Sequence, residues 1–526
     1  MKQRFVARSL SAALAAGALS TPAWAQLRDV TQAPNAANEG IRKSLTEEIG
    51  AGRGDWMTPG SSSFVIARDA FRAIRRGRQL FQRKFTLAQG VGPTTLDGSG
   101  EIGEDGSIGA GLADSCAACH GRPRGSAGFG GDVFTRPDSR DAPHLFGLGL
   151  KEMLGDEITT ELRAVRAAAR NAAQTSGHPV TSVLTSKGID YGRITARPDG
   201  SLDVSEVVGV DADLRVKPFF HDGATFSIRE FVAGALNAEM GLEAPDADLR
   251  AASAGGHVVT PAGMVLDGAL DTVKPPAALP GEDNDGDGHV NEIDTALVDY
   301  LEFYLLNYFK PAQGRQTNET GHGFDTMAQI GCTSCHVQDL TIQRDRRVAD
   351  VETVYDPVRG IFNSLFATAA PLLTPRDDGS GHPPLMVPNR QPFVVRNVFA
   401  DFRRHDLGSH FWERNFNGTT QKLFMTEPLW GVGSSAPYGH DGRSMTLTDV
   451  ILRHGGEAQA ARDGFAALPE VHKQRVLAAL ASLILFPPDD TASNLNPGDR
   501  NAPQFPQRGH GSIALTVLFN DPLDVE

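Results

Sequence analysis

Cysteine is rare in this chain of 526 residues, which has only 4, and they form two distant pairs. A four-cysteine zinc site usually places its two pairs about 15–20 residues apart. Here Cys119 and Cys332 are 213 positions apart (332 − 119), so the two pairs do not fit one zinc site. Each pair therefore has to be explained by its own neighbours in the sequence.

Long apolar runs are absent after the first 25 residues. Even the apolar stretch 297–309 is interrupted by Asp299 and Glu302, so we expect no helix that spans a bilayer. The first 25 residues differ, because a basic start is followed by an apolar centre at 10–19 and by Ala-Trp-Ala at the end. That order is typical of an export signal. The sequence predicts a signal peptide over residues 1–25 and a soluble, periplasmic protein.

Positive charge is in deficit, because 50 lysines and arginines stand against 64 aspartates and glutamates, a formal net charge of −14. A surface of this sign disfavours nucleic acid and anionic membranes as partners. It would suit a basic protein such as a small electron-carrier cytochrome. Solvation alone explains the acidity equally well.

Both cysteine pairs are followed directly by histidine. Two thiols on about one helical turn can reach the two vinyl-derived carbons of a porphyrin, and the adjacent imidazole then becomes the proximal iron ligand. Cys-x-x-Cys-His is therefore the attachment signature of c-type haem, whereas a dithiol redox pair gives no reason for the repeated histidine. The sequence predicts two covalent haems, with His120 and His336 as proximal ligands. The motifs consist of Cys116, Cys119 and His120, and of Cys332, Cys335 and His336.

A second pair of similar segments follows the motifs at nearly equal distances. Residues 217–228 align with residues 436–447, and both segments contain a proline and an aromatic residue shortly before His-Asp-Gly. Their histidines, His221 and His440, are 219 positions apart (440 − 221), while the two motif histidines are 216 apart (336 − 120). Such similar displacements indicate a duplication, in which each half is one haem module.

At these motifs the chain resembles the dihaem oxidoreductase family, whose members are often labelled thiol oxidoreductases and are related to bacterial dihaem cytochrome c peroxidases. The resemblance implies a mainly α fold of two cytochrome-c-like haem domains that face each other, with long loops and a small β-hairpin. It also implies peroxidase-like activity on peroxide or another oxidant. The likeness spans roughly residues 65–487 and is carried by segments 143–150, 331–336, 405–408, 427–433, 440–443 and 454–458.

The duplication and the resemblance together indicate which residues could be the sixth ligand of each haem iron. We expect His440 to ligate the second haem, which would then transfer electrons. We expect the first haem to react, with His221 as a weak, displaceable ligand or a distal acid or base. Trp430 is predicted either to relay electrons between the haems or to pack against a porphyrin edge. Two rival functions remain: a bis-histidine electron-transfer cytochrome without catalysis, and an oxygenase resembling the rubber-cleaving dihaem enzymes.

Residues 283–294 fit a calcium-binding loop. Oxygen donors occupy positions 1, 3, 5 and 9, glycine occupies position 6, and an apolar residue occupies position 8. Histidine at position 7 would offer its backbone carbonyl, and aspartate replaces the usual glutamate at position 12. The alternative is an acidic, glycine-rich turn without a cation. The predicted ligands are Asp283, Asp285, Asp287, His289, Asn291 and Asp294.

Hydrophobic periodicity predicts helices at 66–81 and 151–174 and a closing helix around 476–484. Alternating residues around the turn signal at 197–200 predict a β-hairpin over 191–208. The predicted organisation is a signal peptide (1–25), an N-terminal arm (26–64), a first haem domain (65–253), a linker with the calcium loop and a helix (254–310), a second haem domain (311–490) and a tail (491–526).

Overall fold

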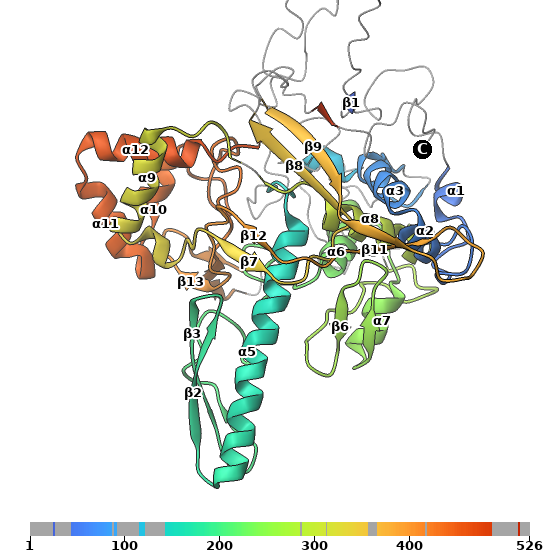
Figure 1. Cartoon of the computed structure of the whole chain (residues 1–526), viewed down its shortest axis with the longest axis horizontal. Helices are drawn as coiled ribbons and strands as arrows, with labels where there is room; N and C mark the ends of the chain where they lie inside the picture. Colours follow the sequence, from blue (N-terminus) through green and yellow to red (C-terminus); the bar gives the residue numbers. More distant parts are fainter. Residues whose placement is uncertain are drawn as a thin grey trace, which may run out of the picture.

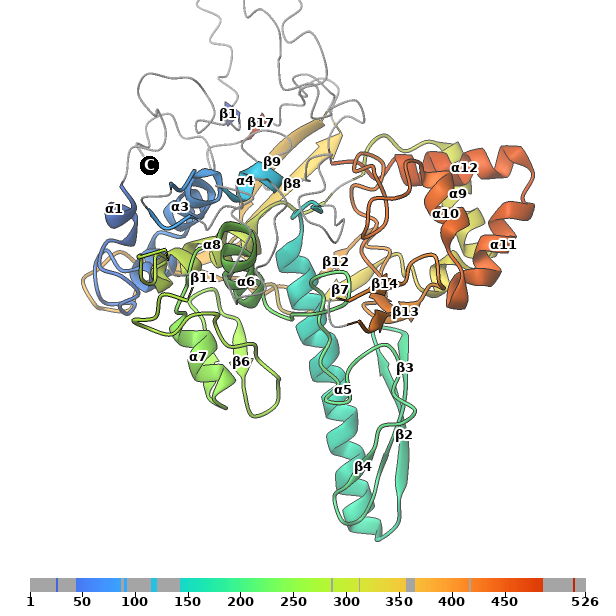
Figure 2. The same cartoon turned by 180° about the vertical axis from the view of Figure 1, so that it is seen from behind.

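Two helical lobes flank a long projecting arm (Figure 1). One lobe contains the helices of the N-terminal part of the chain, and the other contains the last helices (Figure 2). The computed structural model describes residues 25–26, 44–86, 89–91, 115–120, 142–284, 287–311, 313–355, 365–415, 418–485 and 514–515.

The first lobe is organised around α8 (Thr295–Asn307), a helix whose residues are nearly all buried. α3 (Ala70–Gln82) packs on α8 at Gly77, where a Cβ atom would lie 2.1 Å from the backbone oxygen of Tyr300. Only glycine allows the two helices to approach so closely. The other helices of this lobe are α1 (Leu45–Ile49), α2 (Ser62–Arg68), α4 (Cys116–His120), α6 (Ile228–Met240) and α7 (Ala247–Ser253).

A buried arginine joins α6 to α8. Arg229 has no exposed surface, and its guanidinium lies 2.6 Å from Asp246 and 2.8 Å from both Asp299 and Glu302. The three carboxylates are themselves at most 1% exposed. Because an unpaired charge in a protein interior costs several kcal/mol, each member of this network depends on the others.

The arm consists of α5 (Leu148–Ser176) and a three-stranded antiparallel sheet along its outer part (Figure 2). β3 (Ile189–Ala196) is the central strand, between β2 (Val180–Ser186) and β4 (Leu202–Asp203). The predicted turn lies between β3 and β4, where the Gly200 N–H donates to the Arg197 oxygen at 2.9 Å. The apolar side chains that join sheet and helix are Leu154, Ile158, Leu162, Leu184, Ile189, Tyr191 and Ile194.

The second lobe is a cluster of helices around an apolar core. α9 (Asn318–Gln329) packs on α12 (Glu470–Ala481) at Gly323, where a Cβ atom would lie 2.1 Å from the Arg475 oxygen. α10 (Leu447–Arg453) and α11 (Gln459–Ala467) complete the lobe. Its core contains Met327, Phe399, Phe465, Val476, Leu480 and Leu483.

Short antiparallel strand pairs lie between these helices. The pairs are β1 (Ala25–Gln26) with β17 (Ala514–Leu515), β5 (His257–Val259) with β6 (Val265–Asp267), β7 (Leu340–Ile342) with β12 (Phe393–Val395), β8 (Ala349–Tyr355) with β9 (Leu365–Pro371), β10 (Leu373–Arg376) with β11 (Leu385–Pro388), β13 (Arg404–Asp406) with β16 (Leu423–Met425), and β14 (Glu413–Arg414) with β15 (Thr420–Gln421).

The predicted mainly α fold with two cytochrome-c-like domains is wrong. The described residues form a mixed fold of helices and short antiparallel strand pairs, without a clear helical domain of the cytochrome c kind. The error has a physical cause, because most of these pairs have strands of only two to four residues. Strands of that length leave almost no alternating pattern to detect in the sequence.

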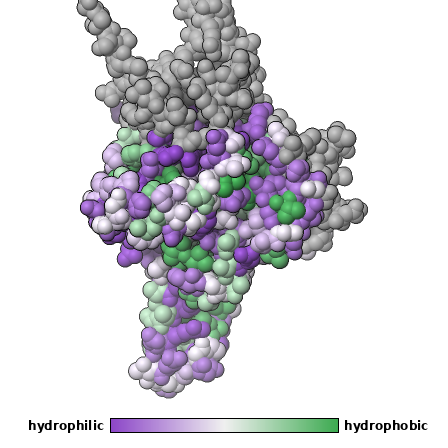
Figure 3. Space-filling model, turned by 90° about the vertical axis from the view of Figure 1, so that its right-hand side faces the viewer, coloured by the Kyte–Doolittle hydropathy of each residue, from purple (hydrophilic) through white to green (hydrophobic). Residues whose placement is uncertain are grey.

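The surface mixes polar and apolar residues. On the face drawn in Figure 3, hydrophobic residues gather where the arm meets the body, between larger hydrophilic areas. No helix in the described ranges is long and apolar enough to cross a membrane. The predicted signal peptide up to residue 24, and the predicted tail apart from β17, lie outside the described residues.

Candidate functional site

The first Cys-x-x-Cys-His motif forms the short helix α4. The His120 ring is hydrogen-bonded through Nδ1 to the backbone oxygen of Pro143, at 2.7 Å. Because a carbonyl oxygen only accepts, Nδ1 carries the proton and Nε2 keeps its lone pair. Desolvation of the partly buried ring lowers the pKa of His120 to about 4. A neutral imidazole that is oriented through Nδ1 is the form that ligates a metal.

The second motif has the same arrangement. Cys332 begins the 3₁₀ turn η2 (Cys332–Ser334), and His336 donates from Nδ1 to the backbone oxygen of Phe399 at 2.9 Å. Desolvation also lowers the pKa of His336. Phe399 holds this contact with a backbone φ of 50°, which a bulky residue rarely adopts. Strain of this kind persists only where the surrounding structure imposes it.

The cysteine thiols do not have the properties of a redox-active pair. None of the four cysteines forms a disulfide. Burial raises the pKa of the Cys116 thiol to about 12 and that of the Cys332 thiol to about 11. Dithiol oxidoreductases need a thiolate at neutral pH, and their Cys-x-x-Cys motifs lower the thiol pKa. The surroundings of both motifs therefore disfavour dithiol chemistry.

Both motifs border apolar walls. Cys116 and Cys119 pack against the core of the first lobe. Cys332 packs against the core of the second lobe, beside Phe324 and Phe399, whose ring centroids are 5.3 Å apart. A porphyrin is a large, flat and mostly apolar group, so its burial against such walls is favourable. The thiols, the free Nε2 atoms and these walls fit a c-type haem at each motif.

The structure brings the two predicted sixth-ligand candidates together. The His221 and His440 rings are stacked, with centroids 5.1 Å apart and planes at 12°. Nε2 of His221 lies 3.0 Å from a carboxylate oxygen of Glu413, and Nε2 of His440 lies 3.4 Å from the same oxygen. Desolvation lowers the pKa of His440 to about 4. Two imidazoles around one carboxylate form a site that can hold or transfer a proton.

The two His-Asp-Gly segments have the same local structure, which supports the duplication. In each, a backbone bridge closes the loop, between Phe219 and Thr225 in the first copy and between Tyr438 and Ser444 in the second. Each segment then enters a helix, α6 or α10, through a capping box. The two copies of the repeat thus meet at their histidines.

A charged histidine lies beside the second motif. Nε2 of His405 is 2.8 Å from the buried Asp401, and Nδ1 is 2.7 Å from Glu457. Burial opposes the charge, but the hydrogen bond to Asp401 and a contact with Cys335 outweigh it and raise the pKa of His405 to about 10. Cys335, Asp401 and His405 have ligand atoms within 4.8 Å of one another. A protonated imidazole donates from both ring nitrogens, so each of the two carboxylates accepts a hydrogen bond from His405.

The charge on His405 predicts a loss of stability at alkaline pH. Its pKa is about 10 in the folded protein and about 6.5 in the unfolded chain. Its stabilising contribution is therefore complete below pH ~6.5 and disappears as the pH rises toward about 10. Relative to His405→Gln, the wild-type free energy of unfolding should fall by up to about 1.4 kcal/mol per pH unit in this window. Urea unfolding of both proteins measures this, and a difference that stays constant with pH would contradict it.

Trp430 lies where the two halves of the chain meet. Its backbone oxygen accepts a hydrogen bond from Nε2 of His144 at 2.7 Å, and His144 follows the proline that orients His120. A Cβ atom at Gly147 would lie 2.9 Å from the indole ring. Within the described part of the chain, Nε1 of Trp430 and Nδ1 of His144 are buried without a hydrogen-bond partner. The relay role of Trp430 stays a prediction.

His454 is a further histidine near the second motif. Its Nδ1 donates to the Val450 oxygen at 2.7 Å, which leaves Nε2 with the lone pair. Burial lowers the pKa of His454 to about 4, and the electrostatic effect of His336 lowers it further. The groups that influence the pKa of His440 are instead Asp441, His221, Glu413 and Arg453. His454 therefore competes with His440 as a candidate ligand on the second haem.

The predicted calcium loop is an irregular turn before α8, and Asp285 lies outside the described residues. Two of its carboxylates accept hydrogen bonds from backbone N–H groups of the loop, and another caps α8. These contacts shape the turn. The predicted ligands that the structure describes are Asp283, Asp287, His289, Asn291 and Asp294.

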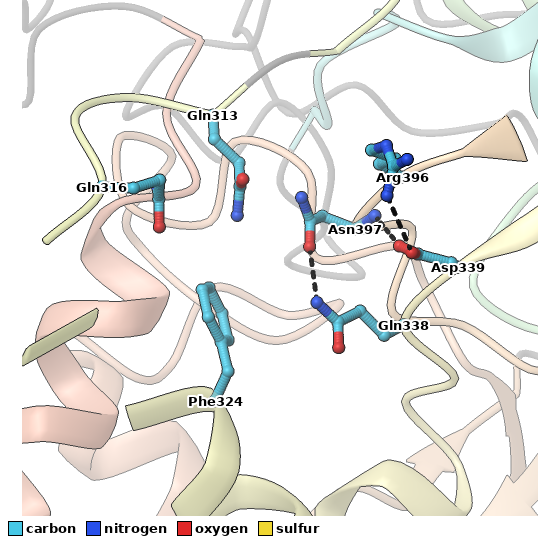
Figure 4. A pocket seen from close by; sticks show the side chains of 7 residues that line it. All are labelled: Gln313, Gln316, Phe324, Gln338, Asp339, Arg396 and Asn397. Carbon is cyan, nitrogen blue, oxygen red and sulfur yellow. Dashed lines mark hydrogen bonds and ion pairs between the residues drawn. The ribbon is translucent and has the colours of Figure 1, made fainter. Parts of the chain in front are cut away.

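A polar cavity of about 240 Å³ lies beside the segment that follows the second motif (Figure 4). Nε2 of Gln338 donates to the Asn397 side chain at 2.9 Å, and the Asn397 N–H donates to Asp339 at 2.7 Å. Phe324 forms an apolar wall. None of the predicted site residues lines this cavity. The lining residues are Gln313, Gln316, Phe324, Gln338, Asp339, Arg396 and Asn397.

Part of the second half of the chain is similar to a known protein family. Residues 346–483 match the model of the family described as "Di-haem oxidoreductase, putative peroxidase". The resemblance that was read from the motifs is confirmed over these residues, and with it the prediction of an enzyme. The match contains Trp430 and His440. No curated protein matches the chain.

Sequence reasoning missed Asp401, Glu413 and Glu457 as members of the site. Asp401 lies four positions before the family-like segment 405–408, Glu457 lies inside the segment 454–458, and each binds His405. In both cases an acidic residue lies within four positions of a histidine, and this pattern could have indicated that the acid belongs to the site. The sequence contains no such signal for Glu413, because only the folded chain brings this residue close to His221 and His440.

Proposed function

We propose that this protein is a periplasmic dihaem c-type oxidoreductase with peroxidase-like activity. The observation that supports this best is common to both Cys-x-x-Cys-His motifs. His120 and His336 each use Nδ1 to bind a backbone carbonyl, at 2.7 and 2.9 Å, and so each offers Nε2 to an iron. The match of residues 346–483 to the dihaem oxidoreductase family supports the same function.

Haem at the two motifs would supply the redox chemistry. The chain's own residues would hold and orient each haem through two cysteines and one histidine. Glu413 can accept a proton at the oxygen that faces Nε2 of His221 and Nε2 of His440. Trp430 lies against the segment that orients His120 and is proposed to relay electrons toward the first haem. Peroxide would be the oxidant and a small cytochrome the electron donor.

Peroxide turnover tests this function. The purified protein is expected to consume hydrogen peroxide at the expense of a reduced small cytochrome, with two cytochromes oxidised for each peroxide reduced. Carbon monoxide should bind to one of the two reduced haems, because a reactive haem needs an open or displaceable position. Absence of both turnover and carbon monoxide binding would exclude a peroxidase.

One observation favours a rival function, a bis-histidine electron-transfer cytochrome. His454 lies near His336 and keeps a free Nε2, and His440 is a second candidate for the same iron. A protein whose irons both have two histidine ligands would not bind carbon monoxide. The experiment above therefore separates the two functions.

We expect His440→Gly to convert the second haem to the high-spin form, because the proposed sixth ligand is lost. His221→Gly should leave the haem content intact and change ligand binding at the first haem. Absorption and electron paramagnetic resonance spectra of the ferric protein measure both effects. His454→Gly is the matched comparison, and a high-spin second haem in that variant alone would identify His454 as the ligand.

We also propose that the loop at residues 283–294 binds calcium, as its spacing of oxygen donors suggests. Export is proposed from the order of features in residues 1–25. Amino-terminal sequencing of the secreted protein should then begin at Gln26.

A further inference from the structure

Both ring nitrogens of His405 face carboxylates. Nε2 lies 2.8 Å from Asp401, and Nδ1 lies 2.7 Å from Glu457. An ionised carboxylate only accepts hydrogen bonds, so each ring nitrogen has to carry a proton. The geometry therefore makes His405 a cation, which agrees with its pKa of about 10. The side chain is only 4% exposed, so salt and water screen this charge weakly.

The charge lies beside the point where the second haem would be attached. Sγ of Cys335 and one ligand atom each of Asp401 and His405 all lie within 4.8 Å of one another. In the haem-loaded protein this sulfur would hold the edge of the porphyrin. His405 would therefore be a near neighbour of the second haem, inside a protein interior where charges interact more strongly than in water.

We propose that the positive charge of His405 raises the reduction potential of the second haem. A nearby cation favours the ferrous iron, because reduction by one electron removes one positive charge from the haem. The carboxylates of Asp401 and Glu457 act in the opposite direction on the same potential. This inference rests on the proposed function, because it needs a haem at the second motif.

The same contacts also have a structural interpretation. Asp401 follows Phe399, whose backbone oxygen orients His336. Three residues of the segment 397–402 that are not glycine have a positive φ, which is 56° at Asn397, 50° at Phe399 and 54° at Phe402. A backbone of this kind has to be held by its surroundings. If His405 only held Asp401 and this segment in place, loss of either of its contacts would disturb His336 in the same way.

Redox titration of the full-length, haem-loaded protein separates the two roles by the sign of the effect. His405→Gln removes a positive charge and should lower one of the two midpoint potentials, while the other stays unchanged. The equilibrium constant for reduction of that haem should fall on the order of tenfold, which corresponds to about 59 mV for one electron. Spectroelectrochemistry of the wild type and the variant measures both potentials.

Glu457→Gln removes a negative charge and should raise the same midpoint potential, because His405 keeps its charge through the buried Asp401. The Glu457 side chain is 48% exposed, so this replacement leaves the buried core unchanged. His257→Gln is the matched control, because His257 also faces a carboxylate, that of Asp267 at 3.3 Å, but is 62% exposed and belongs to β5. It should leave both potentials at their wild-type values.

A potential that falls in both His405→Gln and Glu457→Gln would overturn the inference in favour of the structural role. Unchanged potentials in both variants, with both haems present, would overturn it outright. Glu457→Gln keeps the test decisive if His405→Gln does not fold, since a lowered or unchanged potential in Glu457→Gln alone contradicts the inference. A second motif without haem would overturn the proposed dihaem function as well, whereas shifts of the expected signs without peroxide turnover would exclude only the peroxidase.

Discussion

A variant with Cys332→Ala and Cys335→Ala is expected to carry one covalent haem where the wild type carries two. The thioether bonds of c-type haem form only at cysteine, and each motif of this chain contains two of its 4 cysteines. Loss of one pair therefore removes one attachment site and leaves the other unaffected. The haem content can be measured from the pyridine haemochrome spectrum after extraction with acidified acetone, which removes haem that is not covalently bound.

Two further variants make this experiment decisive. Cys116→Ala with Cys119→Ala should give the same value, one haem, from the opposite half. Thr333→Ala lies between the cysteines of the second motif and should keep both haems. Two extraction-resistant haems in either cysteine variant, or none in the wild type, would exclude covalent attachment at these motifs.

Arg229→Met is expected to destabilise the protein by at least about 3–5 kcal/mol. The arginine is fully buried and is bound to Asp246, Asp299 and Glu302, which are buried as well. Methionine has a similar length but removes the positive partner of Asp246 and Glu302, and it leaves Asp299 with Arg53 alone. Since folded domains are stable by only about 5–15 kcal/mol, a loss of this size would unfold a large fraction of the protein.

The matched control is Arg250→Met, on the exposed side of α7. It should change the free energy of unfolding by less than about 0.5 kcal/mol. Arg229→Lys keeps the charge but loses the forked geometry, so its stability should fall between the wild type and the methionine variant. Urea unfolding measures all three, and an Arg229→Met variant as stable as Arg250→Met would refute the importance of the network.

Local features of the fold were predictable, and long-range pairings were not. The helix predicted at 151–174 corresponds to α5. The helix predicted at 66–81 is divided into α2 and α3 at Asp69, whose side chain caps α3 by accepting from the Arg72 N–H. β7 pairs with β12 some fifty residues along the chain. The local sequence of either strand does not reveal which strand it pairs with. Pairings of this kind were therefore missed, and a mainly α fold was wrongly predicted.

The candidate site was predictable only at the level of its motifs. The spacing of the Cys-x-x-Cys-His motifs reflects covalent chemistry and needs no knowledge of the fold. The duplication made His221 and His440 equivalent, but equivalence does not reveal that they stack on each other beside Glu413.

The arm has a consequence for attaching other molecules to this protein. At 1.5 Å per residue, the 29 residues of α5 span about 44 Å, while the 7 residues of β2 span only about 23 Å. The sheet is therefore shorter than the helix, and near the far end Ala169 and Ala173 of α5 form a small apolar cluster with Ala196 of β3. The exposed turn at 177–179 joins α5 to β2 at the far end. A tag, fluorophore or electrode linker inserted there would stand clear of both lobes and of both cysteine motifs.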